Sequence, residues 1–273
     1  MHDSRHRAGL ALCLALAGCA TATAPDTGPS AGFGLDSPVR ELVASVSPSG
    51  PAERGLRAYA LRIQTLGAGP ETRVDVLGRQ AWRPGGILVA VTGSQGAGVF
   101  GMSRSIGLCG LVSLRLDATI TDQAWLPGDP SRAPLDEVGF TDEVRLDPLT
   151  RMQVTHLRVD GRPCSPQPDA GFSLVLETRS SQAGQGTGVG TTLAGQVRYD
   201  CRAGPGFEPA SRLHPRLPGA MLRVDCRRSG TAARSGGQLA YAWIASSGVY
   251  LLTEHRGQDI AQHYVYTDVV LDP

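Results

Sequence analysis

The chain has 273 residues, with 26 basic and 25 acidic side chains, so its formal net charge is +1. The basic residues are all arginines, and only 5% of the residues are aromatic. General binding of nucleic acids requires a strong basic field, so this balance excludes a nucleic-acid partner. The low aromatic content also disfavours sugar binding through stacked rings.

The first 18 residues have the layout of an export signal. A polar start with Arg5 and Arg7 leads into an apolar run of ten residues from Ala8 to Ala17, and small residues end the segment. A helix needs about 20 apolar residues to cross the hydrocarbon core, so this run is too short for a permanent transmembrane helix. We therefore predict that residues 1–18 are a signal peptide.

The stretch Leu16-Ala17-Gly18-Cys19 ends this signal and resembles the lipobox of bacterial lipoproteins at all four positions. Small side chains at 17 and 18 fit a narrow peptidase cleft, and the thiol of Cys19 supplies the nucleophile that becomes a thioether. The resemblance implies that a diacylglyceryl group is attached to Cys19, that cleavage occurs before it, and that the new amino terminus is acylated, for example with palmitate. Two or three acyl chains make a durable anchor, whereas one binds only marginally.

Ala20 follows this cysteine. In the resembling family, a residue other than Asp at that position implies sorting to the outer membrane. The expected partner is thus a membrane of the cell envelope, reached through lipid on Cys19. The alternative is a secreted protein with a chance cysteine near its cleavage site.

Residues 19–37 are rich in Ala, Thr, Gly and Pro and have too little apolar surface to fold, so we expect a disordered tether. Ser37 and Pro38 then match a helix start, with Ser at the N-cap and Pro at the first helical position. Apolar residues at 39, 42, 43 and 46 predict that a short helix follows.

Beyond this helix the apolar residues recur at every second position, which is the period of a strand. The clearest alternation extends from Leu108 to Ile120 and predicts one long strand. Turn residues such as Asp160-Gly161 separate the β-rich runs. The other predicted strands are 56–66, 73–77, 86–92, 152–159, 172–178, 193–202, 221–227, 238–244, 249–254 and 262–271.

This pattern predicts an all-β fold, either an antiparallel sandwich or a barrel-like sheet. The length fits one large β domain or two small ones. The glycine-rich segment 184–190 is the best boundary, and it separates a first β part at residues 38–183 from a second at residues 191–273.

Six cysteines are present, of which Cys13 leaves with the signal and Cys19 carries lipid. Four remain, and an even number in an oxidising compartment indicates two disulfides, with three pairings open. The favoured pairs are Cys109–Cys164 and Cys201–Cys226. Alternation supports the second pair because it directs both cysteines toward one core. Four buried free thiols are the alternative.

Arginine is concentrated in residues 202–234, which contain seven arginines and only two acidic residues. Such a cluster forms a solvated surface, or a contact to anionic lipid or to an acidic partner. The seven arginines are Arg202, Arg212, Arg216, Arg223, Arg227, Arg228 and Arg234.

Signatures of serine hydrolases, zinc proteases and thioredoxins are missing from the sequence, so we assign no catalytic residue and no cofactor. The match of residues 96–101 to GxGxxG lacks the helix that follows it in dinucleotide sites. The weak metal candidates are His255 and His263, which a hairpin centred near Asp259 would bring face to face, with Glu254 close by. Two solvent-facing histidines are the favoured alternative.

Aromatic residues gather near the end of the chain, where they are expected to form core or a partner-facing sheet surface. They are Tyr241, Trp243, Tyr250, Tyr264 and Tyr266.

Together these features indicate an anchored, disulfide-bonded envelope lipoprotein that acts as a binding or structural module, with an envelope protein as a candidate partner. Two alternatives stay open. One is a carrier or chaperone for an apolar ligand such as a lipid, and the other is an envelope hydrolase. An enzyme is the less favoured class.

Overall fold

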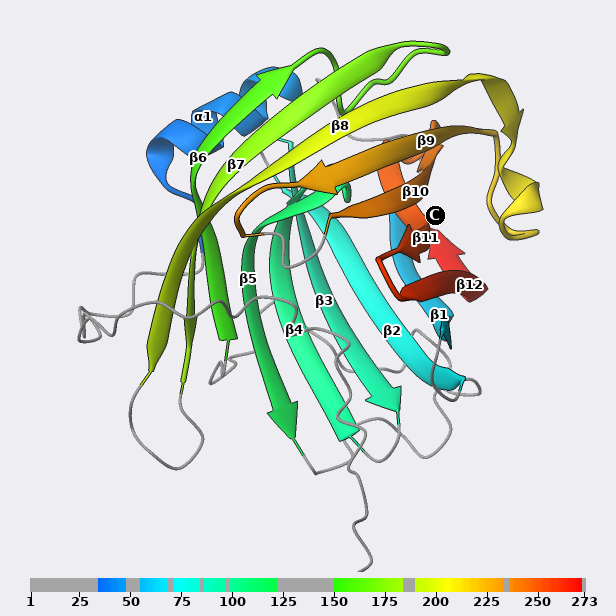
Figure 1. The fold of residues 1–273 in the computed structure, drawn as a ribbon. Coiled ribbons are helices and arrows are strands. Elements are labelled where there is room, and N and C mark those ends of the chain that lie inside the picture. Colours follow the sequence, from blue (N-terminus) through cyan, green and yellow to red (C-terminus); the bar gives the residue numbers. More distant parts are fainter. Residues whose placement is uncertain are drawn as a thin grey trace, which may run out of the picture.

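The computed structural model describes residues 34–47, 55–67, 71–83, 86–96, 99–121, 150–183, 190–232 and 236–271. Within these ranges the chain forms one α-helix, one short 3-10 helix and twelve strands, and the strands close into an antiparallel barrel (Figure 1). Consecutive strands are neighbours, and β1 completes the ring by pairing with β12. The prediction of an all-β antiparallel fold with a short N-terminal helix is confirmed, and its form is a barrel.

Helix α1 is Ser37–Val46, and the 3-10 helix η1 is Ala210–Arg212. The strands are β1 (Leu56–Gly67), β2 (Thr72–Arg83), β3 (Ile87–Gly96), β4 (Val99–Leu108), β5 (Val112–Thr121), β6 (Thr150–Asp160), β7 (Gly171–Gln182), β8 (Thr191–Pro209), β9 (Ala220–Ser229), β10 (Gly237–Ile244), β11 (Val249–Arg256) and β12 (Ile260–Leu271). The longest strand is β8, and its first residues, before Arg198, extend beyond the last residue of β9. The strand then curves over the barrel (Figure 1).

One predicted strand begins with a turn. The alternation from Leu108 to Ile120 predicts a single strand, but the chain reverses between β4 and β5. Cys109 and Gly110 have φ angles of 52° and 77°, in the left-handed region that glycine adopts most readily. The amide of Leu111 donates a hydrogen bond to the carbonyl of Leu108 (2.8 Å) and closes the turn. Apolar residues occupy the turn as well as both strands, so the sequence pattern hides it.

Alternation along each strand separates an inner face of the barrel from an outer face. In β8, the side chains of Val197 and Cys201 are buried, whereas those of Arg198, Asp200 and Arg202 are exposed on the other face. Cross-strand partners share a face, so the register carries this assignment from strand to strand around the ring.

Both predicted cysteine pairs are within disulfide distance. Cys201 and Cys226 are cross-strand partners in β8 and β9, with Cα atoms 4.0 Å apart. Cys109 and Cys164, whose Cα atoms are 5.7 Å apart, join the β4–β5 turn to the loop between β6 and β7. The Cys109–Cys164 bond therefore joins two loops that no ladder of backbone hydrogen bonds connects.

Two tyrosines attach the loops that contain Cys109 and Cys164 to the barrel. The hydroxyl of Tyr241 donates to the carbonyl of Leu111 (3.1 Å), and that of Tyr250 donates to the carbonyl of Pro163 (2.5 Å). The amide of Tyr250 also donates to the carbonyl of Cys109 (2.8 Å). The same loops that the disulfide joins are thus fixed to β10 and β11.

The hairpin of β10 and β11 is packed on both faces. β11 pairs with β12 only through residues 254–256, so its first half diverges from that strand. The outward residues Ala242 and Leu251 share an apolar cluster with the inward residues Leu61 and Tyr266. The tip of the hairpin is therefore covered by side chains that point inward from β1 and β12.

Helix α1 packs through Val39 and Val43, whose side chains are 2% and 0% exposed. Its N-cap residue is Asp36, one position before the predicted Ser37. Leu35 is buried, and Arg115 donates to the carbonyl of Gly34 (2.9 Å). The last residues of the predicted tether therefore belong to the folded part of the chain.

Several predictions concern residues outside the described ranges: the signal peptide, Cys19, most of the tether and residues 184–189 of the proposed boundary. On either side of that boundary, β7 and β8 pair with each other from Gly171–Arg202 to Gln182–Thr191. The division into two β parts stays a prediction. In the described ranges, no helix has the length and hydropathy to cross a membrane.

We expect the Cys201–Cys226 bond to stabilise the barrel because it restricts the unfolded chain. It closes a loop of 25 residues, for which loop entropy predicts roughly 3–4 kcal/mol of unfolding free energy. Urea unfolding of a Cys201→Ser/Cys226→Ser variant should show a loss of this size. An unchanged unfolding midpoint, or peptide mapping that finds other pairings, would contradict the assignment.

Candidate functional site

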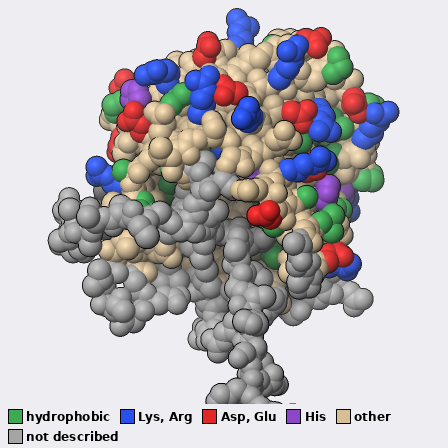
Figure 2. All heavy atoms as spheres, viewed as in Figure 1, with side chains coloured by type: hydrophobic (Ala, Val, Ile, Leu, Met, Phe, Trp, Pro, Cys, Tyr) green, Lys and Arg blue, Asp and Glu red, His purple; other side chains and the backbone are tan. Residues whose placement is uncertain are grey.

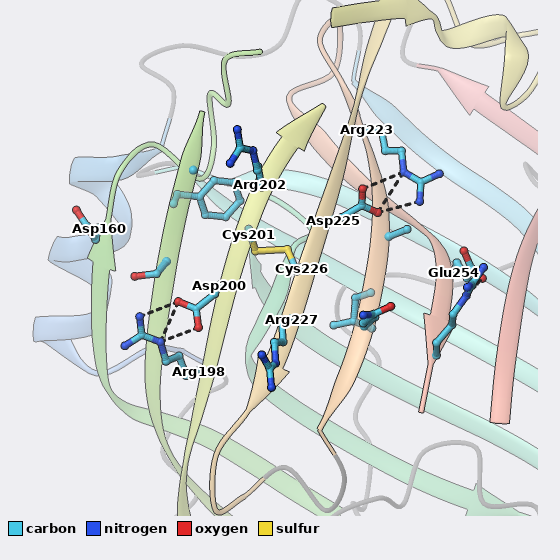
Figure 3. A pocket seen from close by; sticks show the side chains of 17 residues that line it. Asp160, Arg198, Asp200, Cys201, Arg202, Arg223, Asp225, Cys226, Arg227 and Glu254 are labelled. Carbon is cyan, nitrogen blue, oxygen red and sulfur yellow. Dashed lines mark hydrogen bonds and ion pairs between the residues drawn. A yellow bond between two sulfur atoms is a disulfide. The ribbon is translucent and has the colours of Figure 1, made fainter. Parts of the chain in front are cut away.

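The outer face of β7 to β11 carries a charged groove of about 730 Å³, which Asp160 at the end of β6 also lines. Arg223, Asp225 and Arg227 of β9 lie on one side of it, and Glu254 of β11 lies on the other (Figure 3). Arg256 of β11 lines the groove as well. Gln238 and the small Ala240 of β10 lie between these two strands. The groove is therefore a trough between two rows of charged side chains.

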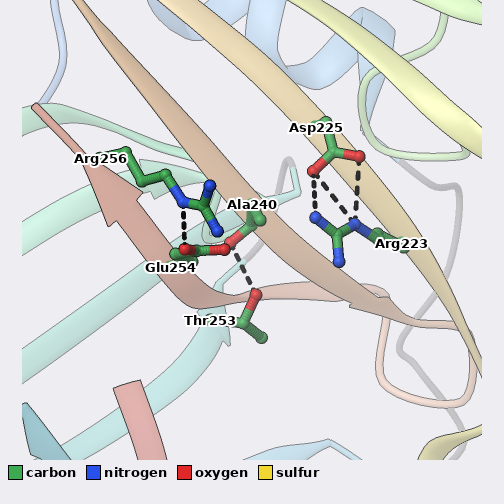
Figure 4. A network of polar contacts seen from close by, with 6 residues as sticks. All are labelled: Arg223, Asp225, Ala240, Thr253, Glu254 and Arg256. Atoms are coloured by element: carbon green, nitrogen blue, oxygen red, sulfur yellow. Dashed lines mark hydrogen bonds and ion pairs between the residues drawn. The ribbon is translucent and has the colours of Figure 1, made fainter. Parts of the chain in front are cut away.

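Ion pairs within single strands neutralise much of this groove. Arg198 pairs with Asp200 (2.7 Å) and Arg223 with Asp225 (2.9 Å), while Arg256 pairs with Glu254 (Figure 4). The hydrogen bond from Arg198 lowers the pKa of the Asp200 carboxyl, and that from Arg223 to Asp225 raises the pKa of the Arg223 guanidinium. Charges of both signs are likewise interspersed over the visible surface (Figure 2). This groove fits a solvated face better than a field for anions.

The inner face has a different chemistry, because the register directs all six tyrosines toward the barrel axis. Tyr59 and Tyr266 meet edge to face with ring centroids 5.9 Å apart, and Tyr241 and Tyr250 do so at 5.8 Å. The absence of a side chain at Gly78 makes room for the ring of Tyr59. The late aromatic residues are thus core residues, as one of the two sequence interpretations holds. The inward tyrosines are Tyr59, Tyr199, Tyr241, Tyr250, Tyr264 and Tyr266.

The interior has a packed half and an accessible half. Toward the disulfide-linked loops, Leu174, Leu222 and Val224 are 0% exposed. Toward the other end, small inward residues stay partly exposed although they point at the barrel axis. These residues are Ala90, Thr92, Ser103, Ser105 and Ala118. Solvent-sized molecules therefore reach inward side chains in this half.

A polar cluster lies on the inner face of β11 and β12. The amide oxygen of Gln262 accepts from the hydroxyl of Tyr264 (3.2 Å) and lies 3.2 Å from Nδ1 of His255. Because this oxygen is an acceptor, Nδ1 carries the proton of the neutral imidazole, and Nε2 presents a lone pair. Nε2 has no hydrogen-bond partner among the described residues. The amide nitrogen of Gln262 in turn donates to Thr65 (3.4 Å).

Arg228 brings a positive charge to the same inner face. It is the cross-strand partner of Tyr199 in β8 and of Gly237 in β10, and its side chain hydrogen-bonds the Tyr199 phenol. Its Nε atom has no hydrogen-bond partner within the described part of the chain. By the strand register, every acidic residue in the described strands faces outward. Arg228 therefore has no inward carboxylate to pair with in these strands.

Burial governs the ionisation of the titratable groups on the inner face. Burial lowers the pKa of His255, the hydrogen bond with Gln262 raises it, and the charge of Arg228 lowers it further. Burial raises the pKa of Tyr59 to about 12 and raises those of Tyr241 and Tyr266 as well. On the described strands, the titratable groups of the inner face are thus neutral phenols, a neutral imidazole and one guanidinium.

The structure separates the two weak metal candidates. His255 pairs with Gln262 and points inward, whereas His263 pairs with Glu254 on the outer face. The expectation that the histidines face each other is wrong, because the β11–β12 register is shifted by one residue from the one it requires. No group of three or more metal-ligating side chains occurs among the described residues.

Arg228 is the residue that sequence reasoning misses, because it stands in the arginine cluster of residues 202–234. The signal that identifies it is the alternation of β9. Leu222, Val224 and Cys226 occupy every second position and face inward, and Arg228 is the next residue of this series. Its neighbour Arg227 faces outward and is exposed. Arg212 and Arg216 form surface ion pairs with Glu208 and Asp268.

Comparison with known proteins adds little to this description. No protein-family model matches the chain, and no curated protein matches it. One solved structure, the hypothetical lipoprotein YmcC from Escherichia coli (K12), aligns with 86% of this chain and 98% of its own. The two sequences are 8% identical and the TM-score is 0.35, which does not establish a shared fold.

The lowered pKa of His255 predicts a specific acid sensitivity. A histidine in the unfolded chain binds a proton near pH 6.5, while His255 in the folded barrel resists protonation. Below that pH the unfolded state binds more protons, so stability is full above about pH 6.5 and falls on acidification. Urea unfolding from pH 7.5 to 5 should show a smaller loss for His255→Gln. The outward His263→Gln control should keep the wild-type loss, and equal curves for both variants would refute the prediction.

Proposed function

We propose that the protein is a lipid-anchored lipoprotein of the bacterial envelope whose barrel binds a small amphipathic ligand in the accessible half of its interior. The lipobox resemblance at residues 16–19 supports the anchor, and Ala20 supports the outer membrane as its place. The two cysteine pairs fit an oxidising compartment, where disulfides persist.

Unsatisfied polar atoms inside the barrel carry the ligand-binding part of this proposal. Three inward side-chain nitrogens beyond the packed half lack a hydrogen-bond partner among the described residues, and they belong to Gln80, Arg228 and His255. Each such buried group costs about 1–3 kcal/mol. Three such atoms in one interior need partners from outside the described residues, and water or the polar groups of a ligand would supply them.

The wall of the accessible half fits an amphipathic molecule. Leu116 and Met152 supply apolar surface on neighbouring strands, and the ring of Tyr264 adds more. The hydroxyls of Thr92 and Ser103 lie 2.7 Å apart on the inner face and offer polar contacts. A largely apolar wall with a few placed polar groups is typical of small-molecule sites.

The anchor is tested by metabolic labelling with palmitate. Wild-type protein should carry the label and float with membranes, and Cys19→Ala should lose the label because no other thiol starts the pathway. Cys13→Ala is the matched control, since this residue leaves with the signal peptide and its loss should preserve labelling. Label on Cys19→Ala would reject the lipoprotein assignment.

The ligand site is tested with N-phenyl-1-naphthylamine, a neutral apolar dye whose fluorescence rises on leaving water. The mature chain of a Cys19→Ser variant, exported behind a cleavable signal, should bind it saturably. Ala90→Trp should abolish the signal because Ala90 points inward and is partly exposed. Gln95→Trp, on the outer face of the same strand, should bind like wild type. Absence of binding by the wild-type barrel would refute an interior site.

A further inference from the structure

We propose that the barrel selects an acidic ligand, with Arg228 holding a carboxylate or phosphate group at the end of an otherwise apolar molecule. This inference rests on the interior site proposed above and specifies its chemistry. The apolar body would lie along the wall formed by Leu116, Met152 and Tyr264, and the acid group would be bound where β8, β9 and β11 bring Tyr199, Arg228 and His255 together.

The charge balance of the interior supports an anion at Arg228. Arg228 is partly buried, and its Nε atom lies out of contact with solvent. Burying a charged donor is costly unless a negative group or a hydrogen-bond acceptor compensates. On the described strands, the phenol of Tyr199 is its hydrogen-bonded neighbour, and the carboxylates all face outward. An acidic ligand would supply the missing negative charge.

Neighbouring groups have the right hydrogen-bonding character for an acid group. A guanidinium presents its donors in a planar fork that matches a carboxylate or phosphate, and Nε of Arg228 is an unused donor of that fork. Tyr241 and His255 are both close enough for the charge of Arg228 to lower their pKa. Nε2 of His255 presents an acceptor for a protonated acid or, once protonated, a second donor.

The backbone leaves space beside these groups. Gly237 is the cross-strand partner of Arg228, and a Cβ atom there would lie 3.1 Å from Nε2 of His255. Any side chain at this position would crowd the imidazole and occupy the gap between β9 and β11. The glycine therefore keeps open the region in which an acid group would contact both residues.

The test compares ligands that share an apolar chain and differ in their head group. Laurate, dodecyl phosphate and the neutral dodecanol displace N-phenyl-1-naphthylamine from the mature chain described above. We expect laurate or dodecyl phosphate to bind more tightly than dodecanol, and the better of the two to identify the acid. Arg228→Gln should weaken the acid by about tenfold or more and change dodecanol binding less than twofold.

Arg227→Gln is the matched control, because it removes the adjacent arginine from the outer face and should leave every affinity unchanged. Arg228→Lys keeps the positive charge but loses the planar set of guanidinium donors, so it should retain a weaker preference for the acid. Equal binding of dodecanol and both acids to the wild-type barrel would overturn this inference and leave the interior site standing. Equal effects of the Arg227 and Arg228 variants would overturn it as well.

Discussion

Closure of the sheet between β1 and β12 is the constraint on which the other features depend. In a closed antiparallel ring each strand is hydrogen-bonded on both sides, and cross-strand partners share a face. The inner face is therefore continuous only where the registers of neighbouring strand pairs are consistent around the ring. A shift of a single residue in the pairing of β9 would turn Arg228 outward and Arg227 inward.

The two adjacent arginines show how strongly this constraint controls chemistry. Arg227 is exposed and lies opposite Asp200 on the outer face, where solvent and neighbouring carboxylates compensate its charge. Arg228 has the same side chain but faces phenols and an imidazole, and no carboxylate of the described strands accompanies it. Position along the strand, and not local composition, decides which arginine belongs to a solvated surface and which to a candidate site.

Sequence patterning predicts much of this fold because alternation and cysteine spacing are local signals. It predicts the β class, helix α1 and both cysteine pairs, and Cys201 and Cys226 indeed share the inner face. It fails where the answer depends on register or on a tight turn. The β4–β5 turn at Cys109 interrupts an unbroken apolar alternation, and a one-residue difference in register separates His255 from His263.

The interior site depends on the exposure of inward side chains in one half of the barrel. The tip of the β10–β11 hairpin, buried on both faces, and the disulfide-linked loops occupy one half with apolar side chains. The other half keeps small residues such as Ala90 and Ser105, together with polar atoms that lack partners. Local choices that oppose stability are expected at sites of function, which is why the accessible half, and not the charged outer groove, is the stronger candidate.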